Sequence, residues 1–133
     1  MLSEAQPDEQ IERDVDRANE VLASLAKLDI GQGCVVGAGQ VWGIETLGGT
    51  DHMLATLPEG VKKARAVLVK RPKTGQDLRV DLPTIGPASI EAAANAGLAG
   101  LVIQAGLVLI IDRDATLKAA DDAGLVLWAR RDM

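Results

Sequence analysis

This chain of 133 residues contains neither phenylalanine nor tyrosine, and its aromatic residues are two tryptophans. Proteins that bind single-stranded nucleic acids usually combine aromatic stacking platforms with a basic groove, whereas this chain has a formal net charge of −5. Its single histidine, His52, and single cysteine, Cys34, cannot supply an internal disulfide or a zinc site made of several such ligands. We therefore expect no nucleic-acid partner, and we interpret Cys34 as a small buried residue.

Long apolar runs are also missing. The most apolar segment, residues 102–111, is interrupted by Gln104 and Gly106 and is shorter than the ~20 residues that cross a bilayer. The first ten residues, MLSEAQPDEQ, are acidic and lack the apolar core of a signal peptide. These absences predict a cytoplasmic protein. A hydrophobic content of 47% is enough to fill one core, so we expect residues 1–133 to form a single domain.

The N-terminal part of the chain has the pattern of an amphipathic helix, because apolar residues recur there at steps of three and four. We predict this helix from Asp8 to about Leu28, and we expect the polar residues 1–7 before it to be frayed. The predicted buried positions are Ile11, Val15, Ala18, Leu22, Leu25 and Ala26. The predicted solvated face is acidic and contains Glu9, Glu12, Asp14, Asp16 and Glu20.

Glycines then mark a turn between two apolar segments. Residues 33–45 are predicted to form a hairpin of two short strands, CVVG and QVWGIE, joined by glycines 37 and 39. The segment GGTD at residues 48–51 precedes HMLATL, so Thr50 or Asp51 is expected to cap a short helix. A glycine pair before a helix can also leave backbone N–H groups free for a phosphate, and spacing alone leaves both roles open.

The hairpin pattern occurs a second time. Residues 33–45 (GCVVGAGQVWGIE) and 100–112 (GLVIQAGLVLIID) share six identical residues in thirteen. Further strands are predicted over 66–70 and 125–129, and further helices over 87–96 and 114–123. The order helix, strand, strand, helix, strand therefore appears twice. This order indicates either a duplicated α-β-β-α-β unit or two hairpins that converged on one pattern. Both alternatives predict an α/β fold, a mixed β-sheet with packed helices.

The segment from Lys70 to Pro87, KRPKTGQDLRVDLPTIGP, concentrates prolines, glycines and charges between a predicted strand and a predicted helix. Seven of the fourteen Lys and Arg residues lie between positions 62 and 79, which would attract an anionic ligand. On an extended segment Asp77, Arg79 and Asp81 would project from one face. Two carboxylates beside a guanidinium suit a metal ion and a phosphate together, although a connecting loop with solvated charges has the same spacing.

Several segments in sequence order resemble one family. These are DIGQGCVV, GxVxGIE, GGTDHML, KRPKTGQDLRVDLPTIG and AGLAGLVIQAG, which together cover about residues 29–128. They resemble the C-terminal domain of the LpxI-type UDP-2,3-diacylglucosamine pyrophosphatases of lipid A biosynthesis. The resemblance implies a hydrolase that is cytoplasmic and peripheral to the inner membrane. It would cleave the diphosphate of UDP-2,3-diacylglucosamine with Mg²⁺, giving UMP and 2,3-diacylglucosamine 1-phosphate.

The motifs that carry the resemblance also imply roles for individual residues. Gly49, Thr50 and Asp51 match a GTD motif of the family, Lys70 and Pro72 match a basic-Pro motif, and Gln76, Asp77, Arg79, Asp81 and Pro83 match QDxRxDxP. The expected substrate-binding residues are Gly49, Thr50, Lys70, Gln76 and Arg79. The expected catalytic residues are Asp77 and Asp81, and these two carboxylates with Asp51 are the expected ligands of Mg²⁺. His52 beside the predicted cap is interpreted as a surface residue.

The chain is about half as long as members of this family, which have an additional N-terminal domain. We therefore expect residues 1–133 to correspond to the catalytic domain alone, with the N-terminal domain as a missing partner and the membrane surface reached through the lipid substrate. A homodimer is left open. The alternative function is a non-catalytic module that binds a nucleotide sugar or another subunit, in which the carboxylates only hold Arg79 and Lys70 in place. A metal requirement would distinguish the enzyme from the binding module.

Overall fold

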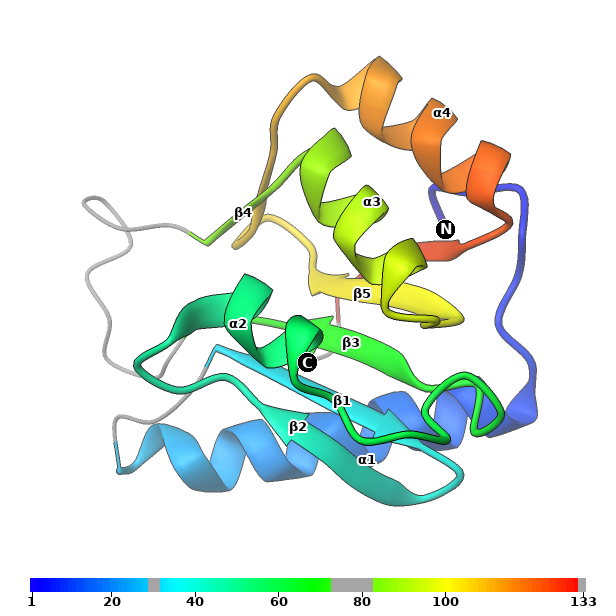
Figure 1. Cartoon of the computed structure of the whole chain (residues 1–133). Coiled ribbons are helices and arrows are strands. Elements are labelled where there is room, and N and C mark those ends of the chain that lie inside the picture. Colours follow the sequence, from blue (N-terminus) through cyan, green and yellow to red (C-terminus); the bar gives the residue numbers. More distant parts are fainter. Residues whose placement is uncertain (29–31, 73–82, 132–133) are drawn as a thin grey trace.

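A five-stranded mixed sheet forms the centre of the computed structural model, which describes residues 1–28, 32–72 and 83–131 (Figure 1). The strand order is β2-β1-β3-β5-β7. Strand β1 pairs antiparallel with β2 and with β3, whereas β3, β5 and β7 run parallel to one another. The bounds of these strands are β1 Gly33–Gly37, β2 Gln40–Ile44, β3 Val67–Lys70, β5 Gly100–Gln104 and β7 Val126–Arg130. Two further strands, β4 (Thr84–Ile85) and β6 (Leu109–Ile110), form a separate parallel pair.

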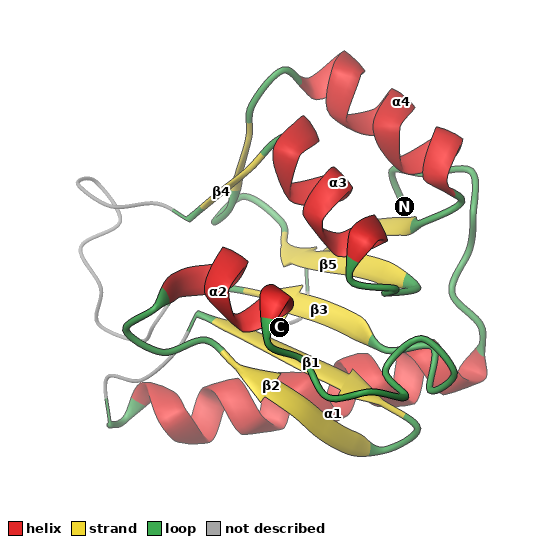
Figure 2. Cartoon of the chain, in the orientation of Figure 1, coloured by secondary structure: helices red, strands yellow, loops and turns green. Residues whose placement is uncertain are grey.

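Helices cover both faces of the large sheet (Figure 2). Helix α1 (Glu9–Ala26) packs on one face, and α2 (Gly49–Ala55), α3 (Pro87–Asn95) and α4 (Arg113–Ala123) lie on the other. Each face has its own cluster of buried apolar side chains. The prediction of an α/β fold with helices packed on a mixed sheet is therefore confirmed.

Burial on both faces explains the unbroken apolar runs in β1, β3 and β5. Successive side chains of a strand point to opposite faces, so Val67 and Val69 pack against α1 while Leu68 packs among the other helices. In β1, Cys34 faces α1 and is fully buried. Burial raises the pKa of the Cys34 thiol to about 11. The thiol is therefore neutral at physiological pH, in agreement with its interpretation as a small buried residue.

The predicted N-terminal helix is present with nearly the expected bounds. Asp8 is its N-cap, and the Asp8 carboxylate accepts a hydrogen bond of 2.9 Å from the Ile11 N–H. This hydrogen bond and the Arg65 guanidinium, 2.6 Å away, lower the pKa of Asp8. All the predicted buried positions of the helix are buried except Leu25, which is half-buried.

Asp14 corrects the prediction of a fully solvated acidic face, because only 2% of this residue is exposed. Its two carboxylate oxygens accept hydrogen bonds from the backbone N–H groups of Ala38 (3.1 Å) and Gly39 (2.9 Å). Both of these residues have positive φ angles and form the turn between β1 and β2, so the predicted hairpin is confirmed. The carboxylate of Asp14 fastens this turn to α1, a role that helical periodicity alone could not reveal.

Residues 2–4 also differ from expectation, since they are not frayed. The backbone N–H groups of Leu2 and Ser3 donate hydrogen bonds to the carbonyl of Leu127 in β7. In return, the Leu127 N–H donates to the Ser3 hydroxyl at 2.7 Å. The N-terminal segment thus covers the edge of β7, where unpaired backbone groups would otherwise remain.

The second predicted hairpin, at residues 100–112, is wrong. Strand β5 has β3 on one side and β7 on the other, so no edge remains free for β6, which pairs with β4 instead. The turn residues show a local reason. Ala38 and Gly39 both have positive φ, as a tight two-residue hairpin turn requires, whereas at the matching positions 105 and 106 only Gly106 does. The element order α-β-β-α-β therefore occurs twice, but the two units are arranged differently.

None of the helices in the described ranges is long and apolar enough to cross a membrane.

Replacing Asp14 by alanine should lower the free energy of unfolding by about 1–3 kcal/mol. The backbone N–H groups of Ala38 and Gly39 would both lose their hydrogen-bond acceptor in this variant. Glu12→Ala, an exposed change on the same helix, should alter stability by less than about 0.5 kcal/mol. Urea denaturation of both variants measures the difference. Equal stabilities would show that the contact between Asp14 and the turn does not stabilise the fold.

Candidate functional site

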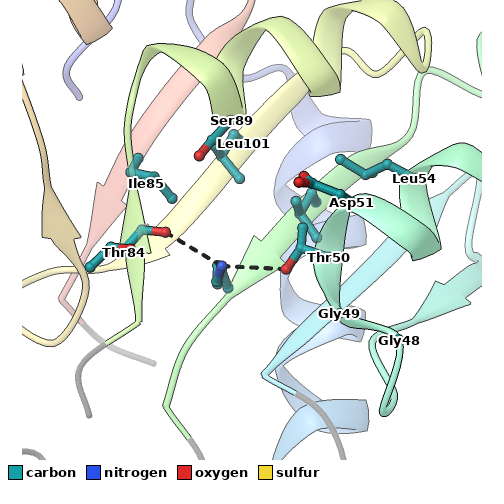
Figure 3. Close-up of a pocket in the computed structure, with 11 residues that line it drawn as sticks. Gly48, Gly49, Thr50, Asp51, Leu54, Thr84, Ile85, Ser89 and Leu101 are labelled. Carbon is teal, nitrogen blue, oxygen red and sulfur yellow. Dashed lines mark hydrogen bonds between the residues drawn. The ribbon is translucent and has the colours of Figure 1, made fainter. Parts of the chain in front are cut away.

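A cavity of about 310 Å³ opens at the ends of β3 and β4, beside the start of α2 (Figure 3). Figure 3 shows Thr84, Ile85 and Ser89 on one side of it and Thr50, Asp51 and Leu54 on the other. Its full lining is Gly48, Gly49, Thr50, Asp51, Leu54, Leu68, Lys70, Thr84, Ile85, Ser89 and Leu101. The apolar side chains of the lining come from β3, β4 and β5 and from helix α2.

Lys70 supplies the positive charge of this cavity. Its ammonium group donates two long hydrogen bonds, to the Thr50 hydroxyl at 3.4 Å and to the Thr84 carbonyl at 3.5 Å, which are the dashed lines in Figure 3. Both acceptors are neutral, and within the described ranges Lys70 forms no ion pair. The side chain is half-buried, so its charge acts on a ligand with less screening than a fully exposed lysine would. An anion placed in the cavity would meet a cation that forms no ion pair with the described residues.

The position of Lys70 follows from the topology. It is the last residue of β3, and β3 runs parallel to β5, so the cavity lies at the carboxyl end of the parallel strands. Open α/β sheets commonly bind their ligands at this end. The next residue, Arg71, has two contacts. Its backbone N–H donates a hydrogen bond of 2.9 Å to the Gln32 carbonyl, and the Arg71 guanidinium contacts the Asn19 side chain on α1. These contacts anchor the start of the segment that leaves the sheet.

The GGTD segment is placed somewhat differently from the prediction. Thr50 and Asp51 lie in the first turn of α2, the N-cap is Gly48, and neither side chain caps the helix. The φ angle of Gly49 is +86°, a conformation that other residues rarely adopt, so a glycine is required there. With the capping role excluded, the side chains of Thr50 and Asp51 are free to line the cavity.

Four of the residues assigned from the sequence therefore share one cavity: Gly49, Thr50, Asp51 and Lys70. The GGTD segment thus lies beside two described parts of the segment 70–87, at Lys70 and at Thr84. The remaining assigned residues, Gln76, Asp77, Arg79 and Asp81, lie outside the described residues.

The structure adds residues that sequence reasoning missed. Thr84 contributes a backbone carbonyl, which no side-chain pattern could indicate. Ser89 lines the cavity while its hydroxyl accepts a hydrogen bond of 3.1 Å from the Gly86 N–H at the start of α3. In the sequence, Ser89 follows Pro87 at the predicted start of a helix. This pattern indicates where the helix begins, but it does not indicate a cavity.

Asp51 is the described carboxylate that lines the cavity, and it is exposed. Carboxylate oxygens of this kind fit Mg²⁺, which binds through one or two carboxylates together with water and substrate phosphate. In the described ranges, no group of three or more His, Cys, Asp or Glu side chains could hold a metal ion. Asp51 could thus supply one ligand of a cation whose other expected protein ligands, Asp77 and Asp81, are not described.

Together, the mixed α/β fold and a cavity bearing a lysine at the carboxyl ends of parallel strands define an α/β domain suited to an anionic ligand. Residues 1–128 match the sequence model of the LpxI C-terminal domain. The chain belongs to this family. The match begins at residue 1, so α1 is part of the family domain, although the recognised motifs begin only near residue 29.

A curated relative supports the same assignment. The chain is 50% identical over 119 residues to the UDP-2,3-diacylglucosamine pyrophosphatase LpxI of Caulobacter vibrioides. The aligned part covers 84% of this chain and 42% of the relative. The chain thus spans less than half the length of this relative.

Lys70→Met should weaken binding of pyrophosphate to the chain by at least about tenfold, because it removes the charge in the cavity and keeps most of the apolar stem. Lys63→Met removes an exposed charge from the same basic segment and is the matched control, with an expected change below about twofold. Isothermal titration calorimetry of the two variants measures both values. Equal losses would mean that the overall charge of the segment, rather than the cavity, attracts the anion.

Proposed function

We propose that this chain is the catalytic C-terminal domain of a UDP-2,3-diacylglucosamine pyrophosphatase of lipid A biosynthesis. The reaction is hydrolysis of the diphosphate to UMP and 2,3-diacylglucosamine 1-phosphate. The observation that carries the proposal is the cavity in which both described hydrogen-bond acceptors of Lys70 are neutral oxygens, in a chain that is 50% identical to a protein of that name. A diphosphate would offer charged oxygens to a lysine whose described hydrogen-bond acceptors are neutral.

In this proposal Lys70 binds a phosphate oxygen of the substrate. Its present hydrogen bonds, at 3.4 and 3.5 Å, are at the long limit for such bonds, so a charged acceptor would replace them favourably. Thr50 and Gly49 line the same wall and orient the bound group. Gln76 and Arg79 are proposed as further substrate contacts, with Arg79 suited to a bidentate contact to phosphate.

The proposed cofactor is Mg²⁺, held by Asp51, Asp77 and Asp81. When bound, the cation neutralises charge on the diphosphate and lowers the pKa of a coordinated water. Of Asp77 and Asp81, one carboxylate is proposed mainly to hold the cation and the other to accept the proton of the attacking water. Either residue could have either role. Hard oxygen donors are the appropriate ligands for this ion, and Asp51 already lines the cavity.

The size of the cavity indicates that other surfaces bind the rest of the substrate. A volume of about 310 Å³ is at the lower end of the ~300–1,000 Å³ typical of sites for drug-sized ligands. It suits a diphosphate and part of a sugar rather than two acyl chains as well. We propose that an N-terminal domain, corresponding to the part of the relative that this chain does not match, completes the cleft. Access to the lipid substrate would place the enzyme in the cytoplasm, peripheral to the inner membrane.

Asp77→Asn and Asp81→Asn, introduced into a protein that contains both domains, should each reduce hydrolysis of UDP-2,3-diacylglucosamine at least about a hundredfold. An amide keeps the shape of the carboxylate and removes the charge that holds a divalent cation. Release of UMP is the measurement, with melting temperature as the control for folding. Activity within a few-fold of wild type in a normally folded variant would remove that residue from the mechanism.

The 133-residue chain alone should fold cooperatively but hydrolyse this substrate weakly or not at all. Two buried clusters and a complete sheet support independent folding, whereas the walls for the acyl chains lie elsewhere in this proposal. Adding the separately expressed N-terminal half of a relative should increase the rate of UMP release. Robust Mg²⁺-dependent turnover by the chain alone would contradict the division of the site between two domains.

A further inference from the structure

Glu45 stands out beside the cavity because one of its carboxylate oxygens, Oε2, is buried and accepts no hydrogen bond in the described structure. The residue follows β2, and its backbone N–H donates to the Gly33 carbonyl at 2.8 Å. A buried acceptor without a donor costs free energy, so such groups are few in native proteins and require an explanation. Glu45 belongs to the GxVxGIE segment, which the site described above does not use.

Gly33 is what allows the carboxylate to lie there. A Cβ atom added to Gly33 would be 2.9 Å from the Glu45 Oε2 and 3.4 Å from a methyl group of Leu68. Any side chain at position 33 would therefore displace the carboxylate of Glu45. The glycine leaves a space on this face, and the Glu45 carboxylate lies over it.

This space is next to Lys70. Gly33 in β1 is paired with Lys70 in β3, and residues directly opposite each other in an antiparallel pair point to the same face of the sheet. Leu68, which is in contact distance of the same space, lines the cavity together with Lys70. The loop that begins at Glu45 ends at Gly48 and Gly49 in the cavity wall. The carboxylate of Glu45 is thus on the cavity face of the sheet, one strand away from the lysine.

A carboxylate and a lysine on the same face of the sheet favour different parts of one ligand. The phosphate groups of the proposed substrate carry negative charge and are repelled by Glu45, so they belong at Lys70. The free oxygen of Glu45 can accept a hydrogen bond from a part of the ligand that carries no negative charge. In a nucleotide sugar the hydroxyl groups of ribose and of the hexose are such donors, and a carboxylate commonly recognises sugar hydroxyls in nucleotide-binding folds.

We propose that Glu45 is a substrate-binding residue whose carboxylate accepts a hydrogen bond from a sugar hydroxyl adjacent to the diphosphate. This inference depends on the proposed function, since it assigns a part of that substrate to a residue of this chain. Glu45 is half-buried as a residue but its Oε2 is buried, so contact with a ligand in the cavity requires the carboxylate to turn toward it. The terminal torsion of a glutamate is soft and roughly two-fold, so either oxygen can be turned toward the ligand.

The test compares three ligands that contain the relevant chemistry separately: inorganic pyrophosphate, UMP, and glucosamine 1-phosphate. Each is titrated into the wild-type chain, Glu45→Gln, Gly33→Ala and Lys70→Met, with Mg²⁺ present. Glu45→Gln keeps the shape of the side chain, and Gly33→Ala moves the carboxylate without changing it. The φ angle of Gly33 is not in the positive range, so alanine is compatible with its backbone. Melting temperatures show that each variant is folded.

Glu45→Gln and Gly33→Ala should raise the Kd for at least one of the two sugar phosphates about tenfold and leave the Kd for pyrophosphate within about twofold. Loss with UMP assigns Glu45 to the ribose, and loss with glucosamine 1-phosphate assigns it to the hexose. Unchanged affinity for both sugar phosphates, or an equal loss for all three ligands, would overturn the role of Glu45. If Glu45 has no such role but Lys70→Met still weakens the binding of pyrophosphate, the proposed function stands without this inference. If wild type binds none of the three ligands, both fail.

Discussion

The structure of this site depends on one interaction, the placement of the Lys70 ammonium group among neutral oxygens at the end of a buried strand. Its partners are the hydroxyl of Thr50 and the carbonyl of Thr84, which belong to segments on opposite sides of the cavity. A half-buried cation in this environment attracts an anion more strongly than an exposed lysine, because water and salt screen it less. The fold brings Thr50 and Thr84 together at this charge.

The architecture around Lys70 keeps it in place. Strand β3 lies in the middle of the sheet, between β1 and β5, and residues 67–69 are buried on both faces. The hairpin that contains β1 is fastened to α1 by the buried carboxylate of Asp14. The chain that follows Lys70 is anchored by Arg71, which contacts Gln32 and Asn19. A change at Asp14 or Arg71 should therefore affect the position of the lysine, although neither residue lines the cavity.

Local signals in the sequence predicted much of this fold. The three- and four-residue spacing of apolar residues predicted α1, and the glycines at 37 and 39 predicted the first hairpin. The same reasoning failed at residues 100–112, where a similar sequence does not form a hairpin. The partner of a strand depends on which edges the rest of the sheet leaves free, and both edges of β5 are occupied. It also failed at Asp14, whose acidic side chain looked like part of a solvated face. Its backbone partners come from a turn more than twenty residues away in the chain.

For the site, motifs identified Gly49, Thr50, Asp51 and Lys70, and the structure places these four in one cavity. Contributions made through the backbone, such as the carbonyl of Thr84, leave no mark in the side-chain pattern. The orphaned oxygen of Glu45 is a different case, since its motif was recognised but its environment depends on the missing side chain of Gly33 across the sheet. Sequence patterns therefore located the site, whereas the hydrogen-bond environment of each group required the three-dimensional structure.

The central claim is that the cavity beside Lys70 is where the diphosphate is held. A crystal structure of the chain grown with pyrophosphate and Mg²⁺ tests it most directly. The account predicts phosphate density within hydrogen-bond distance of the Lys70 ammonium group, between Thr50 and Thr84. Density at another surface hollow, the one lined by Arg13 and Arg17 of α1, with none beside Lys70, would contradict it.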